Sequence, residues 1–223
     1  MRRAGLPIAF SQGFTPHPKI SYASAAPTGV ASEAEYLEIG LQAATEPGVV
    51  RESLDAALSP GLDVLDAVEA RAGTSLADRI DASAWRIELP GVDADTLGQA
   101  VAAFTAAEEV LVERLTKQGR RTFDTRGAVA DIAVISGSSS VISELAAPSE
   151  VTGVPCAILD LVVRQVTPSV RPDDVLAGLR VVADLEPPVP PRATRLAQGT
   201  LTAQGAIVDP LEADRDEIPI GER

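Results

Sequence analysis

Apolar and polar residues alternate along several short stretches of the chain. Apolar residues at every second position, bounded by Gly, Pro or charged residues, are typical of half-buried strands. This pattern predicts strands over residues 34–42, 62–70, 84–89 and 109–115. A more continuous apolar run over residues 155–166 predicts the most deeply buried strand of the chain.

Between these stretches, apolar residues recur at helical spacing. They predict helices that begin near Thr45, near Ser75, after Asp93 and at Pro172. Asp93 has a side chain suited to cap a helix, and Pro172 followed by two acids suits a first helical turn. The last helix is expected to cover residues 173–182.

The order of these elements predicts an α+β fold with mostly antiparallel sheets and with helices on one face. Two strand–helix–strand patterns echo each other, which favours two ferredoxin-like halves, residues 1–82 and 83–185. A polyproline run, EPPVPP, follows them and acts as a rigid spacer. The acid-rich, aperiodic sequence behind it predicts an extended, mobile tail over residues 186–223.

The composition excludes several kinds of site. The chain has 223 residues with one cysteine and one histidine, which excludes an intramolecular disulfide, a two-His metal site and an iron–sulfur cluster held by this chain alone. We therefore expect this chain to bind no cofactor. No apolar run is long enough to cross a membrane, and no signal peptide is recognisable, so we expect a cytoplasmic protein.

The charge is unevenly spread along the chain. The formal net charge is −13, yet residues 1–32 contain Arg2, Arg3 and Lys19 and no Asp or Glu. A strongly acidic chain opposes non-specific binding to nucleic acid, because phosphates are repelled. A local basic site at the N-terminal end remains compatible with this balance.

The segment 10–22 is the first candidate binding surface. Pro16 and Pro18 fix two backbone φ angles and favour a stiff, extended loop. Rings and hydrogen-bond donors follow one another in it: Phe10, Gln12, Phe14, His17, Lys19 and Tyr22. This mixture suits single-stranded RNA or an acidic protein partner, although Phe10 or Phe14 could equally fill the core beneath the loop.

Two further groups of charged residues are candidates. Glu35 is either part of a solvated strand edge or a partner for Arg2, Arg3 or Lys19. A basic turn is either a solvated tip or a patch for an anionic ligand, to which arginine side chains are well suited. Its residues are Lys117, Arg120, Arg121 and Arg126. Cys156 lies in the most apolar strand and is expected to be an inert, buried thiol.

Several motifs resemble one known family. Residues 3–7 (RAGLP), 10–14 (FSQGF), 16–21 (PHPKIS) and 32–37 (SEAEYL) are densely spaced, with further matches at 120–126, 170–176 and 194–199. Together they resemble the radical SAM-linked domain-of-unknown-function family. Its members occur alone, beside, or fused to a B12-binding radical SAM protein. Because family members carry a strand and a helix before the RAGLP run, we expect the natural chain to start upstream of Met1.

This resemblance implies a partner and no chemistry of its own. A radical SAM protein uses an iron–sulfur cluster, S-adenosylmethionine and, in this subgroup, cobalamin, but this chain lacks the required three-cysteine motif. The expected function is a non-catalytic accessory or substrate-binding module for such an enzyme, with RNA or a ribonucleoprotein as a candidate partner. One alternative is a small-molecule or nucleotide enzyme that uses His17, Glu35 and arginines. Another is an assembly factor in an RNA-processing complex.

Overall fold

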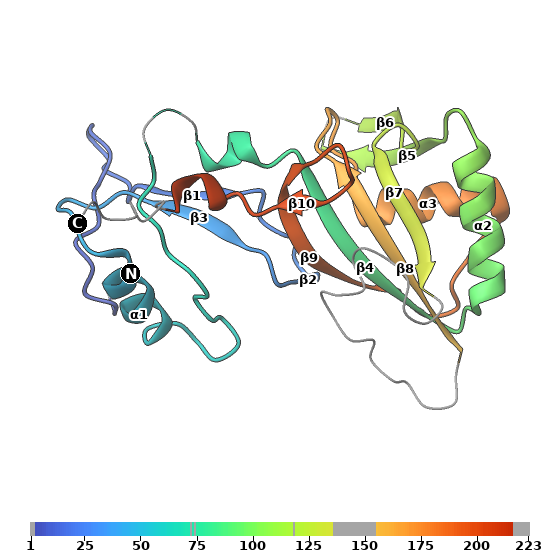
Figure 1. Ribbon diagram of the computed structural model, residues 1–223. Coiled ribbons are helices and arrows are strands. Elements are labelled where there is room, and N and C mark those ends of the chain that lie inside the picture. Colours follow the sequence, from blue (N-terminus) through green and yellow to red (C-terminus); the bar gives the residue numbers. More distant parts are fainter. Residues whose placement is uncertain (1–2, 72, 74, 118, 136–154, 216–223) are drawn as a thin grey trace. The chain divides into compact units, whose positions relative to one another are not determined.

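The computed structural model describes residues 3–71, 73, 75–117, 119–135 and 155–215 (Figure 1). It confirms an α+β fold with three α-helices and mostly antiparallel strand pairs. The chain forms two compact units that interleave in sequence. The first unit comprises Met1–Ala25, Glu35–Arg79 and Pro210–Arg223, and the second comprises Ala26–Ala34 and Ile80–Asp209.

The second unit contains the main sheet and two of the helices. Its sheet has the strand order β10-β9-β4-β8-β7, and the short strand β2 pairs with β9. The elements in chain order are β2 (Ala31–Ser32), β4 (Ala82–Pro90), α2 (Ala94–Ala106), β5 (Leu111–Thr116), β6 (Gly119–Asp124), β7 (Val129–Ile135), β8 (Cys156–Arg164), α3 (Pro172–Ala183), β9 (Arg192–Leu201) and β10 (Ile207–Val208).

This topology is a single ferredoxin-like unit with an inserted hairpin. Without the β5–β6 hairpin, the order β4-α2-β7-β8-α3-β9 is the β-α-β-β-α-β pattern, and its four strands pair antiparallel. The expected division of the chain into two ferredoxin-like halves, residues 1–82 and 83–185, is therefore wrong. Among its described residues, the first unit has a single two-stranded sheet, β1-β3.

The helices of the second unit follow the predicted signals. The Asp93 side chain accepts a 2.8 Å hydrogen bond from the Thr96 amide and caps α2, while α3 begins at Pro172 as expected. Figure 1 shows α2 and α3 on one side of the sheet. They pack together because Gly178 leaves room: a Cβ there would lie 2.9 Å from the Phe104 ring.

The apolar core lies between these helices and the sheet. Alternation along β4 turns Ile87 and Leu89 towards the helices, where Leu159 and Leu161 of β8 join them; all four are fully buried. The helices contribute a matching set of buried side chains: Leu97, Ala100, Phe104, Val175 and Leu179. Burial of such aliphatic side chains supplies the main stabilisation of this unit.

The other face of the sheet buries an ion pair. Arg86 of β4 and Asp160 of β8 are cross-strand partners, 5% and 1% exposed. The Arg86 guanidinium donates to both carboxylate oxygens, from Nε at 2.9 Å and from Nη2 at 3.0 Å. This hydrogen-bonded carboxylate raises the pKa of Arg86, against the opposing effect of burial. Arg86 therefore stays charged inside the sheet.

Residues 192–201 differ most from the sequence prediction. They were expected in a mobile tail, but they form β9 in the interior of the sheet, paired with β4. Arg195, Leu196 and Gln198 are buried there. Two of these side chains donate to the segment before β3: Arg195 Nε donates to Ser32 Oγ at 3.2 Å, and Gln198 Nε2 donates to the Ala34 carbonyl at 2.5 Å.

The first unit has few regular elements. They are β1 (Ile20–Ala23), β3 (Tyr36–Ile39), α1 (Pro47–Asp55) and the 3₁₀ turns η1 (Leu76–Arg79) and η2 (Glu212–Asp214). The strand expected over 62–70 is absent: this described segment has no strand partner, and Leu65 is 80% exposed. The helix expected near residue 75 is only the turn η1.

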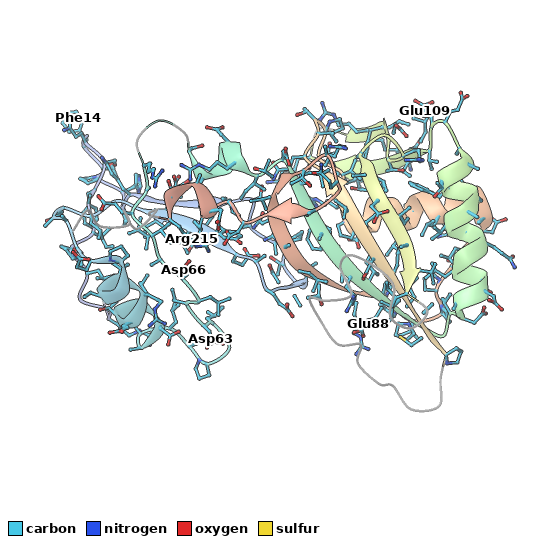
Figure 2. The ribbon with its side chains drawn as sticks, in the orientation of Figure 1. Phe14, Asp63, Asp66, Glu88, Glu109 and Arg215 are labelled. Carbon is cyan, nitrogen blue, oxygen red and sulfur yellow. The ribbon has the colours of Figure 1, made fainter. Side chains whose placement is uncertain are left out.

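The C-terminal segment 210–215 is bound to the first unit rather than extended as a tail. The buried Asp214 carboxylate accepts hydrogen bonds from the Arg79 side chain and the Arg71 amide. The Arg79 hydrogen bond holds the pKa of Asp214 below its usual range. Figure 2 shows Arg215 beside Asp66, with which it forms an ion pair at 3.0 Å.

The buried ion pair gives a first prediction. Asp160→Ala should lower the free energy of unfolding by about 3–5 kcal/mol, because it leaves the Arg86 charge buried without its carboxylate. Urea unfolding measures this change. Glu113→Ala, which removes the exposed Glu113–Arg120 pair, is the control and should cost less than about 1 kcal/mol. Equal midpoints for the two variants would contradict the structural role of Asp160.

The position of β9 gives a second prediction. A chain that ends at residue 185 should lose cooperative unfolding, because β4 loses its neighbour and the sheet loses Arg195, Leu196 and Gln198. A chain that ends at residue 215 keeps every described strand and should melt cooperatively. Circular dichroism during heating tests both. A cooperative transition of the shorter chain at the full-length temperature would show that β9 is dispensable.

Candidate functional site

Residues 9–19, here called the hairpin loop, form a turn-back structure tied by its own backbone. The Lys19 amide donates to the Ala9 carbonyl and the Ser11 amide donates to the His17 carbonyl, both at 2.8 Å. The His17 amide donates to Ser11 Oγ at 2.9 Å, and Phe10 pairs with Pro18 as an isolated bridge. The prolines and these bonds together restrict the loop.

The base of the hairpin loop depends on close contact with Gly40. The Gly40 amide donates to the Lys19 carbonyl and its carbonyl accepts from the Ala9 amide, both at 2.8 Å. A Cβ at residue 40 would lie 2.9 Å from the Lys19 Cβ, closer than such atoms approach. Only glycine therefore lets the chain pass this close to Lys19.

The aromatic side chains of this region point into solvent. Phe14 is fully exposed at the outer end of the loop (Figure 2), and Phe10 is 50% and Tyr22 66% exposed. Neither phenylalanine fills the core, so the alternative in which Phe10 or Phe14 packs beneath the loop is wrong. Gln12, His17 and Lys19 are exposed as well.

The remaining N-terminal candidates are only partly brought to the loop. Arg2 lies outside the described residues. Arg3 is exposed and lines a shallow depression of about 360 Å³ with Ser53 and Leu58 at the end of α1. Glu35 is exposed just before β3 and has a contact within the chain. No hydrogen bond or ion pair joins a carboxylate to the His17 or Lys19 side chain in the described part of the chain.

The basic residues of the β5–β6 hairpin do not converge. Arg120 and Arg121 are neighbours in β6, so their side chains leave opposite faces of the hairpin. Arg120 pairs with Glu113 at 3.3 Å, and Arg121 lies opposite Arg114 in the strand register. Lys117 is exposed after β5. This geometry favours the interpretation of the basic turn as a solvated tip over the interpretation as a patch for an anionic ligand.

The Arg126 side chain is held by contacts within the second unit. Its guanidinium donates to the Val129 and Thr105 carbonyls, each at 3.4 Å, and lies 6.0 Å from the Phe104 ring centre. The neighbouring Asp124 holds this turn. Burial opposes ionisation of Asp124. The amides of Val110, Gly127 and Arg126 donate to its carboxylate, outweigh burial and hold the pKa of Asp124 below its usual range.

Sequence reasoning missed Arg114, which anchors the β5–β6 hairpin. Arg114 forms a 2.7 Å ion pair with Asp174 in the first turn of α3, and its guanidinium lies 4.8 Å from the Phe123 ring centre. Burial raises the pKa of Asp174, and Arg114 partly offsets this effect. The signal was present: Arg114 lies two positions from the buried Val112 and so shares its face.

The described residues offer neither a metal site nor a membrane-spanning helix. No group of three or more His, Cys, Asp or Glu side chains is arranged to hold a metal ion. None of the described helices combines the length and the apolar character needed to span a bilayer.

Comparison with known proteins identifies the family. A family model described as "uncharacterized protein conserved in bacteria (DUF2344)" matches residues 1–172. The chain belongs to this family. No curated protein and no solved structure matches it. The DUF2344 match spans the hairpin loop, the β5–β6 hairpin and the start of α3 at Pro172, so it includes every candidate residue named above.

The exposure of the hairpin loop gives a third prediction. The double variant His17→Ala, Lys19→Ala should change the free energy of unfolding by less than about 0.5 kcal/mol, because neither side chain makes a polar contact within the described fold. Gly40→Ala should instead cost about 1 kcal/mol or more through its clash with Lys19. Thermal unfolding measures both. A loss above about 2 kcal/mol in the double variant would make the loop architectural.

Proposed function

We propose that this DUF2344 protein is a non-catalytic accessory module that binds a substrate on the hairpin loop for a separate, B12-binding radical SAM enzyme. The link to that enzyme class rests on the motif resemblance over residues 3–41. In this proposal the enzyme carries the iron–sulfur cluster, S-adenosylmethionine and cobalamin, and this chain contributes binding alone.

One observation supports the binding role: the backbone of the hairpin loop is restrained, whereas its side chains are exposed to solvent. Backbone hydrogen bonds and two prolines restrict the loop, while Phe14 contributes nothing to the core. A fully exposed aromatic side chain on a restricted backbone favours recognition, because little conformational entropy is lost when a ligand contacts it. Loops held by a scaffold commonly carry binding residues.

The alternative of an enzyme that uses His17 and Glu35 gains no support from the geometry. A general base needs a proton within reach and an orienting partner. Within the described residues, no carboxylate hydrogen-bonds to the His17 side chain. No observation favours the assembly-factor alternative either, so the accessory binding module is the function supported best.

Consumption of S-adenosylmethionine by a reconstituted enzyme tests this function. Cobalamin-binding radical SAM proteins from the same genome are purified and supplied with cell extract that lacks this chain. Adding the wild-type chain should raise consumption by one of them several-fold. The triple variant Phe14→Ala, His17→Ala, Lys19→Ala should not, because the loop no longer holds substrate.

Leu65→Ala is the matched control for this experiment. Leu65 is an exposed apolar side chain of the same unit, 80% accessible and outside the hairpin loop. The Leu65→Ala variant should stimulate the enzyme as the wild type does. If no such enzyme responds to the wild-type chain, or if the triple variant stimulates equally well, the proposed function fails.

A further inference from the structure

The hairpin loop also points to a class of substrate. We propose that it binds single-stranded RNA by stacking unpaired bases on Phe14 and on the neighbouring rings. This inference rests on the proposed function, which by itself leaves the substrate open.

The first argument is the nature of the exposed side chains. Phe10, Phe14 and Tyr22 are planar rings that are half to fully accessible. Base–aromatic stacking is the main sequence-tolerant contact by which proteins hold single strands. A ring at the outer end of a loop can reach a base only when that base is unpaired, so a duplex is excluded from this contact.

The second argument is charge complementarity confined to this end of the chain. Residues 3–32 include Arg3 and Lys19 and no Asp or Glu, within a chain of net charge −13. Lys19 lies at the base of the loop, exposed, and the exposed His17 imidazole and Gln12 amide supply hydrogen-bonding groups near the rings. A phosphate is attracted here and repelled by the acidic remainder, so only a short segment of RNA can bind.

An acidic protein segment would also be attracted by Lys19, but the side chains favour RNA. The large apolar side chains exposed on the loop are both phenylalanines, whereas exposed leucines of the same unit, such as Leu62 and Leu65, lie outside it. Apolar protein partners are served by aliphatic as well as aromatic contacts. Rings alternating with donors are instead what stacked bases and their exocyclic groups require.

Fluorescence anisotropy of the full chain with a labelled oligouridine of about twelve nucleotides tests this inference. Phe14→Ala should weaken binding roughly 5- to 150-fold, the range measured for loss of one stacked base. Leu65→Ala should bind as the wild type does. If Arg3 and Lys19 each neutralise one phosphate, the logarithm of the affinity should fall with the logarithm of the salt concentration with a slope of about −1.4.

Three results would overturn the inference. The first is no anisotropy change at a chain concentration of about 100 µM, where even weak non-specific binding is detected. The second is equal binding of duplex RNA or of Phe14→Ala, which would indicate charge attraction alone. The third is tighter binding of labelled polyglutamate than of RNA, which would assign the loop to an acidic protein.

The outcomes also separate this inference from the proposed function. If RNA binding fails while the triple loop variant still loses stimulation of the enzyme, the loop binds another substrate and only the RNA assignment is wrong. If RNA binds as expected but no radical SAM enzyme responds to the chain, the RNA assignment stands and the proposed function fails.

Discussion

The antiparallel pairing of β9 with β4 is the interaction on which the second unit depends. It places β9 beside the central strand, and both β2 and β10 pair with β9 in turn. The guanidinium of Arg195 lies 5.5 Å from the Trp85 ring centre, where cation–π attraction adds to its hydrogen bond with Ser32. One strand therefore completes the ferredoxin-like sheet and fixes the segment that precedes β3.

The two units are stabilised by different interactions. The second buries a continuous aliphatic core between a sheet and two helices. The first has few buried apolar side chains among its described residues, namely Ile8, Ala23, Leu54 and Leu76, and relies on polar ties such as Arg79–Asp214. An exposed ring such as Phe14 adds nothing to so small a core. This contrast is the physical reason to connect the ring with binding.

Much of the second unit could be predicted from local sequence. β4, β8, α2 and α3 appear where alternation, helical spacing, Asp93 and Pro172 placed them, because those signals act within a few residues. The candidate site was predicted in part. The restricted, exposed hairpin loop follows from its prolines and composition, whereas the split of Arg120 from Arg121 depends on strand register.

What only the tertiary structure decided concerns partners far apart in the chain. The sequence of β9 reads as a polar segment behind a polyproline run, and Arg195 and Gln198 are unsuited to a core on their own. They can be buried because Ser32 and Ala34, 163 and 164 residues away in sequence, accept their hydrogen bonds. The local pattern of apolar and polar residues cannot reveal a hydrogen-bond partner so distant in the chain. The sequence by itself therefore determined the fold class, the helices α1, α2 and α3 and the character of the loop. Long-range hydrogen bonding decided which polar segment completes the sheet.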